Sequence, residues 1–131
     1  MIHLSVLRLR PDKLDRLTDW FSEANERGDE VRQTFAQEGV RHEQAYLLHT
    51  ADGPLVIYVE EVKDIVAAEA AFRSSTIPID AEHKAVMAEV IDGKVDTTLL
   101  FDMTADGGRT QPGPDVQGIT VPDTSGHSRP R

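Results

Sequence analysis

Apolar residues along this chain recur at every second position in some blocks and at every third or fourth position in others. The alternation at every second position predicts β-strands over residues 2–10, 41–50, 54–62 and 95–102. The second and third of these strands are joined by an Asp-Gly dipeptide, which is typical of a tight hairpin turn. Apolar side chains occur on both sides of several strands.

A helical spacing of apolar residues, three or four apart, follows the first strand. It predicts a long helix over residues 12–38, with a bend or break at Gly28 and a C-cap at Gly39. A second helix is expected over residues 63–74. A third is expected after Pro78, with its apolar positions and His83 on one face.

The expected ends of this third helix are Asp80 and Gly93. Asp80 could be its N-cap, because a carboxylate at that position accepts hydrogen bonds from the first free backbone N–H groups. Gly93 is expected to end the helix before the last strand.

Residues 105–131 differ from the rest of the chain in composition. They hold five of the nine glycines and four of the seven prolines, and no aromatic residue. Such a segment buries too little apolar surface to fold alone. We therefore expect one folded domain over residues 1–104, followed by a tail over residues 105–131 that is either flexible or an arm docking on a neighbour.

The order strand, helix, strand, strand, helix, strand predicts an α+β fold, a ferredoxin-like β-α-β-β-α-β protomer. Its helices would cover one face of a four-stranded antiparallel sheet and leave the other face bare. A bare apolar face would exceed the few hundred Å² that monomers usually expose. We therefore expect a homodimer in which two sheets face each other, a dimeric α+β barrel.

Three stretches carry a resemblance to a known family. They are the Arg-Pro-Asp-Lys sequence at residues 10–13, Glu-Gly-Val at 38–40 and the run from Phe72 to His83. On these stretches, residues 1–104 resemble a family of small uncharacterised bacterial proteins in the dimeric α+β barrel superfamily. The superfamily includes monooxygenases, sugar mutarotases and ligand-binding proteins, so the resemblance implies the barrel fold without naming a reaction.

Charge and composition narrow the expected partners. The formal net charge of −9 repels phosphate backbones and anionic lipids, so neither nucleic acid nor a membrane surface is an expected partner. No apolar stretch approaches the roughly 20 residues that span a bilayer, and the N-terminus lacks the pattern of a signal peptide. These two absences predict a cytoplasmic protein, and the lack of cysteine means that no disulfide or thiolate chemistry is available.

His83 is the main candidate for chemistry. It interrupts an apolar helical stripe and follows Asp80 by one turn, so the carboxylate could orient the imidazole for a role as general base or ligand contact. The alternative is a structural histidine paired with a backbone carbonyl, with Asp80 only a helix cap.

Polar aromatic residues on the central hairpin form a second candidate group. By the two-residue period, Tyr46 and His42 share one face and His49 lies on the other, while Tyr58 could join either. Tyr46 and Tyr58 could line a pocket in the barrel. They could equally pack at a dimer interface, where tyrosine is enriched.

Arg8 lies on the same side of the first strand as three apolar residues. It could bind the carboxylate of a ligand. It could also pair with Glu60 or Glu61 on a neighbouring strand.

Three functions remain open from the sequence. The first is binding of a small, mostly apolar organic molecule between sheet and helices, with His83, Tyr58, Tyr46 and Arg8 as contacts. The second is a cofactor-independent monooxygenase or isomerase with His83 as base. The third is a structural or interaction protein with a filled barrel. No metal-ligand spacing, phosphate loop or nucleophile motif is present, so no metal or cofactor is expected.

Overall fold

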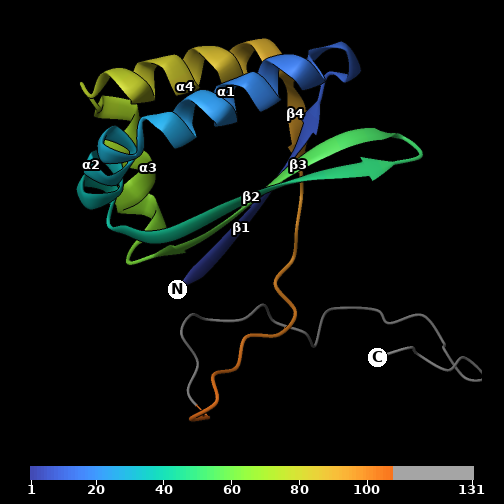
Figure 1. Cartoon of the computed structure of the whole chain (residues 1–131). Coiled ribbons are helices and arrows are strands. Elements are labelled where there is room, and N and C mark those ends of the chain that lie inside the picture. Colours follow the sequence, from blue (N-terminus) through green and yellow to red (C-terminus); the bar gives the residue numbers. More distant parts are fainter. Residues whose placement is uncertain (108–131) are drawn as a thin grey trace, which may run out of the picture. The chain divides into compact units, whose positions relative to one another are not determined.

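The computed structural model describes residues 1–107 (Figure 1). Its single sheet contains β1 (Ile2–Leu9), β2 (Val40–Thr50), β3 (Gly53–Val62) and β4 (Ile91–Val95). The strands lie in the order β2-β3-β1-β4, and each neighbouring pair is antiparallel. The expected α+β class and four-stranded antiparallel sheet are thus confirmed.

Four α-helices cover one face of this sheet (Figure 1). A 3-10 turn, η1 (Pro11–Lys13), leads into α1 (Leu14–Glu26), and α2 (Gly28–Glu38) follows. The second crossover contains α3 (Ile65–Ser74) and α4 (Pro78–Val90). Helix α1 lies beside α4, and α2 beside α3.

The expected break of the first long helix is confirmed next to Gly28. Arg27 leaves helical geometry with φ −106° and ψ 40°, and it separates α1 from α2. Its guanidinium contacts Glu23, Glu30 and Glu82 at 3.2, 2.8 and 2.6 Å, so one side chain ties the break to α4. The predicted C-cap is confirmed as well, because Gly39 ends α2 with φ 74°.

The expected last strand over residues 95–102 was wrong. The chain becomes extended at Ile91, directly after α4, and β4 ends at Val95. Gly93 therefore lies within a strand and does not end a helix; its φ of 97° accompanies the irregular register opposite Leu7 and Leu9. Residues 96–104 belong to neither a helix nor a strand.

The chain divides into two units, Met1–Thr97 and Thr98–Arg131. The first contains every helix and strand given above. Most of the tail expected over residues 105–131 lies outside the described residues. Among the described residues, no helix combines the length and apolarity needed to cross a bilayer.

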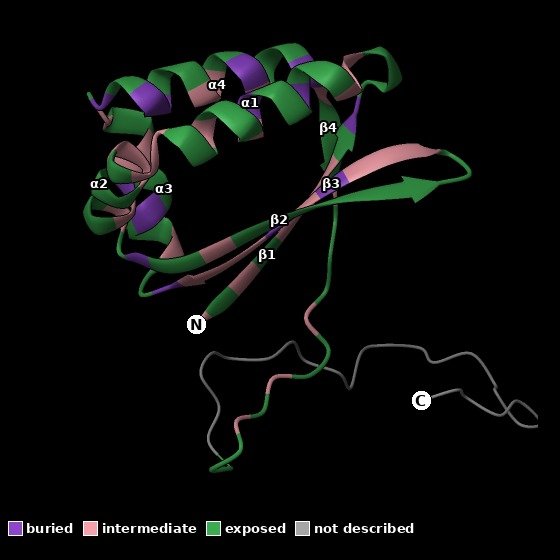
Figure 2. Ribbon diagram, in the orientation of Figure 1, coloured by how far each residue is buried: buried purple, intermediate pink, exposed green. Residues whose placement is uncertain are grey.

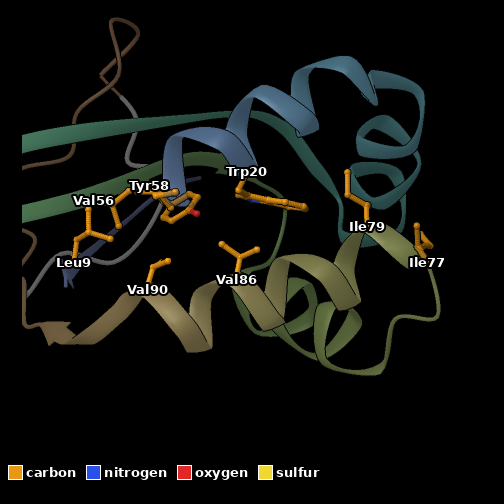
Figure 3. Close-up of a cluster of buried hydrophobic side chains, with 9 residues drawn as sticks. Leu9, Trp20, Val56, Tyr58, Ile77, Ile79, Val86 and Val90 are labelled. Carbon is orange, nitrogen blue, oxygen red and sulfur yellow. The ribbon is translucent and has the colours of Figure 1, made fainter. Parts of the chain in front are cut away.

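The side of the sheet that faces the helices, here called the helix-side face, carries two separate cores. The larger one packs β1, β3, α1 and α4 together around Trp20 (Figure 3). Its buried members are Leu9, Leu17, Trp20, Val56, Tyr58, Ile77, Ile79, Val86 and Val90. The smaller one, at the other end of the strands, is formed by Val40, Val62 and Ala68.

The opposite side of the sheet, here called the open face, is not covered by a helix (Figure 2). Register assigns alternate residues of the strands to it. Its apolar members are Ile2, Leu4, Val6, Tyr46, Leu48, Leu55, Ile57 and Val59. Four of them, Ile2, Leu4, Tyr46 and Leu48, are 43–62% exposed, which confirms the expectation of a bare apolar face.

Candidate functional site

A cleft of about 1030 Å³ lies between the two cores of the helix-side face. The sheet forms its floor, and all four helices contribute to its walls. The volume is at the upper end of the 300–1,000 Å³ typical of small-molecule pockets. The cleft exists because the apolar pattern of the strands is interrupted halfway along the sheet.

That interruption is a band of small and polar side chains across three strands. On β3, Glu60 lies between the inward-facing Tyr58 and Val62, and its cross-strand neighbours are His3 and Glu43. In the next row, Ser5 and Ala45 flank Tyr58. These side chains are too short or too polar to pack against the helices, so the space above them stays open.

Glu43 and Glu60 form a coupled pair of carboxyls on the cleft floor. Burial, together with the negative charges of Glu60 and Glu38, raises the pKa of Glu43 to about 8. Burial also raises the pKa of Glu60, although His3 and a hydrogen bond from Glu43 act in the opposite direction. At neutral pH the pair therefore retains a proton, with Glu43 donating to Glu60.

Glu38, at the end of α2, also lines the cleft. Burial, together with the charges of Asp80 and Glu60, raises its pKa to about 7. Thr34 donates a hydrogen bond to Glu38 at 3.4 Å, which partly offsets the increase.

Aromatic rings form one wall of the cleft. The imidazole of His83 stacks on Trp20 with ring centroids 5.4 Å apart and an interplanar angle of 21°. The ring of Phe72 meets His83 edge-on, also at 5.4 Å. These rings make one wall flat and apolar, with a single polar edge provided by His83.

His83 and Tyr58, which both line the cleft, are joined by a hydrogen bond. Tyr58 Oη lies 3.2 Å from His83 Nε2 and 3.6 Å from Met87 Sδ. Burial lowers the pKa of His83 to about 4, against the charge of Asp80, and burial raises the pKa of Tyr58 above its usual value. Both groups are therefore neutral at pH 7, and their hydrogen bond joins an uncharged imidazole to an un-ionised hydroxyl.

Asp80 has a role different from the one expected. The N-cap of α4 is Ile77, with Pro78 in the first turn, so the prediction of Asp80 as the cap was wrong. Its buried carboxylate accepts hydrogen bonds from Thr34 at 2.6 Å and Ser75 at 2.5 Å. Asp80 thus connects α2 and the α3–α4 turn to α4, and it influences His83 only through its charge.

The remaining candidates, Tyr46 and Arg8, lie on the open face. Register pairs Tyr46 with Ile57, whereas Tyr58 pairs with Ala45, so the two tyrosines point to opposite sides of the sheet. The Tyr46 hydroxyl donates to Gln44 at 3.0 Å. The expected grouping of Tyr46 with Tyr58 and His83 is therefore not found within one chain.

Arg8 is opposite Leu55 on β3. Its guanidinium donates to the carbonyl of Lys94 at 3.3 Å, so the expected pairing with Glu60 or Glu61 was wrong. Glu61 contacts Arg41 instead.

Sequence reasoning missed the carboxyl pair and the aromatic wall. Glu60 gave a usable signal, because a glutamate at an inward position between Tyr58 and Val62 breaks an otherwise apolar strand face. The partnership with Glu43 depends on register, which the sequence left open. Among residues 1–107, no group of three or more histidine and acidic side chains is arranged to hold a metal ion.

Comparison with known protein families identifies the family of this chain. Residues 1–106 match the model of a family of unknown function, DUF6176, and the chain belongs to that family. No curated protein and no solved structure matches the sequence.

Proposed function

We propose that this protein binds a small, mostly apolar organic molecule in the cleft between sheet and helices. The observation that carries the proposal is the cleft itself, a space of about 1030 Å³ kept open by a polar band between two cores. A purely structural protein would gain stability from larger apolar side chains at Ser5, Ala45 and Glu60.

The arrangement of the walls suggests how such a ligand would lie. A flat apolar part would pack beside the rings of Trp20, Phe72 and His83. A polar group would then reach the Glu43–Glu60 pair, whose remaining oxygen atoms can accept a hydrogen bond while the retained proton lies between the two carboxyls. This favours ligands with one hydrogen-bonding end over doubly charged anions.

Trp20 allows the proposal to be tested directly, because it is the only tryptophan in the chain and lines the cleft. Titration with the neutral aromatic probe N-phenyl-1-naphthylamine should quench Trp20 emission in a saturable manner. Ala45→Phe would fill the floor beside Tyr58 and should weaken probe binding at least about tenfold, equivalent to about 1.4 kcal/mol.

Ala70→Phe is the matched control, because Ala70 is exposed on α3 and does not line the cleft. This variant should bind the probe as the unmodified chain does. Equal binding by both variants, or no saturable quenching at all, would refute the cleft as a binding site.

A second function, cofactor-independent catalysis by a monooxygenase or isomerase, is favoured by one observation. His83 is neutral at pH 7 and hydrogen-bonded to Tyr58 at the edge of the cleft, so it could accept a proton from a bound substrate. Its low pKa makes it a weak base, and for this reason binding remains the primary proposal.

The two functions differ in what replacement of His83 would do. If it is a catalytic base, His83→Gln should abolish turnover and leave the melting temperature unchanged, with a smaller loss of probe binding because the ring is also part of the cleft wall. His42→Gln, on the exposed open face, is the control. A lower melting temperature with unchanged binding would instead assign His83 a structural role.

We further infer that the protomer is ferredoxin-like and forms a homodimer through the open face. The strand order β2-β3-β1-β4 and the β-α-β-β-α-β sequence support the first point. The exposed apolar side chains of the open face support the second. Sedimentation at micromolar concentration should give the mass of a dimer, and a monomer would contradict the assembly.

A further inference from the structure

Exposed apolar side chains in the described chain are concentrated in two regions. Of the nine large ones, four are on the open face, namely Ile2, Leu4, Tyr46 and Leu48. Three others follow one another closely after the sheet ends, namely Leu100, Phe101 and Met103. Leu47 and Val66 lie elsewhere.

The second region is a stretch with the composition of a strand that is not part of the sheet. Residues 97–103, here called the arm, contain two threonines, two leucines and a phenylalanine, residue types that suit a pleated and half-buried surface. No helix or strand is formed there, and Leu100 and Phe101 are 66% and 78% exposed. The sequence therefore places three exposed apolar side chains, Leu100, Phe101 and Met103, in a segment that forms neither a helix nor a strand.

The sheet of the first unit also has unused pairing capacity. β4 pairs with β1 only from Val6 to Leu9, so the stretch of β1 from Ile2 to Ser5 has a strand on one side only. The outer edge of β2 is unpaired along its 11 residues within the described chain. Long free edges of this kind recruit extended segments.

We propose that the arm of each chain docks on the open sheet of a second copy, so that two copies exchange arms. This inference rests on the homodimer proposed above and specifies which residues complete its interface. The apolar side chains of the arm would cover the apolar open face of the partner. Because every copy carries both an arm and a face, the exchange closes with twofold symmetry and leaves neither region unused.

The size of the interface supports exchange between copies. The open face provides 13 side chains at alternate positions of the three long strands, and a stable interface takes about 20 to 30 residues from each partner. The seven residues of the arm bring each copy into that range. An arm lying on its own face would cover only a strip of it and would leave most of the face bare.

Because the chain contains no cysteine, this proposal can be tested by crosslinking two introduced cysteines. Tyr46→Cys would place a thiol on the open face and Phe101→Cys one on the arm. A short bis-maleimide should crosslink a chain carrying both substitutions. Dilution with an excess of cysteine-free chain, followed by exchange of subunits, should abolish that crosslink if it joins two copies. A crosslink that survives dilution within one chain would refute the exchange.

Association measurements give an independent test. In the full chain, Leu100→Asp together with Phe101→Asp should weaken dimerisation on the order of 100-fold, because two apolar anchors are replaced by charges. Val66→Asp is the control, since Val66 is 72% exposed but lies on α3, and it should leave dimerisation unchanged.

The outcomes separate this inference from the assembly on which it rests. A dimer that is retained in the arm variant but lost in Ile57→Asp would overturn the exchange and leave the face-to-face dimer standing. An unmodified chain that sediments as a monomer would overturn both.

Discussion

Residues of β3 alternate between two different environments. Val56, Tyr58 and Val62 point to the helices and are buried, whereas Leu55, Ile57 and Val59 point to the open face. The helix-side face is apolar at both ends and polar in the middle, where Glu60 lies. The open face has no comparable polar band at its centre. A polar interruption on a covered face leaves a cleft, whereas the continuous apolar row on the uncovered face is the basis of the proposed homodimer.

The first prediction compares two adjacent residues that face opposite sides. Val56→Asp would bury an unpaired charge in the larger core at a cost of several kcal/mol, against a typical total stability of about 5–15 kcal/mol. We expect this variant to be unfolded or to melt at a much lower temperature. Ile57→Asp should remain folded as a protomer and lose only its association.

Circular-dichroism melting and sedimentation of both variants check this contrast. Equal unfolding of the two would show that the open face is buried within the protomer. A fully associated Ile57→Asp would show that this face does not hold the dimer together.

The second prediction concerns the buried hydrogen bonds of Asp80, which connect the helices around the cleft. Asp80→Ala removes the acceptor of short hydrogen bonds from Thr34 and Ser75 and leaves Thr34 only its longer contact with Glu38. The loss should be about 3 kcal/mol of unfolding free energy, measured by urea denaturation. Asp80→Asn keeps one acceptor oxygen and should lose less; equal stability of all three chains would contradict the network.

The sequence predicted the parts of the fold that depend on local chemistry. The break at Gly28, the cap at Gly39 and the hairpin between β2 and β3 follow from backbone preferences of glycine and from the two-residue period. The last strand was misplaced because strand propensity is local, while membership of a sheet requires a partner. Residues 97–101 have the propensity but belong to no strand.

In the candidate site, too, local features could be predicted from the sequence and long-range contacts could not. His83 stood out as a polar residue in an apolar stripe, and the structure places it in the cleft. The side of the sheet to which Tyr58 points depends on the register of its strand. A shift of one residue would turn every side chain of that strand to the opposite face. Thr34 and Asp80 are 46 residues apart, so no local pattern could have paired them.

The third prediction compares how stability depends on pH when Glu60 on the helix-side face or Glu61 on the open face is replaced. The pKa of Glu43, coupled to Glu60, is raised in the folded state, so the fold binds more protons than the unfolded chain. The contribution of this proton to the free energy of unfolding is therefore complete below the usual carboxyl pKa of about 4.3. It is lost as pH rises through the folded-state pKa of about 8. The slope should not exceed about 1.4 kcal/mol per pH unit for each proton.

The range between pH 7 and 8 is the most informative for this test. The low pKa of His83 acts in the opposite direction, with stability lost as pH falls from about 6.5 through about 4, so the two effects overlap only in acid. Glu60→Gln should flatten the decrease in melting temperature between pH 7 and 8. Glu61→Gln, one residue along on the open face, should retain it, and identical pH profiles would refute a coupled pair in the cleft.

The smallest effect is expected from removal of residues 105–131. Both cores, the cleft and the open face lie within the unit Met1–Thr97, and truncation after Thr104 also retains the arm. Melting temperature should change by no more than the equivalent of about 0.5 kcal/mol, the usual range for changes away from packed regions. Dimerisation should be unchanged as well, in contrast to the arm variant with Leu100→Asp and Phe101→Asp. A dimer lost on truncation after Thr104 would move the docking segment beyond the arm and into residues 105–131.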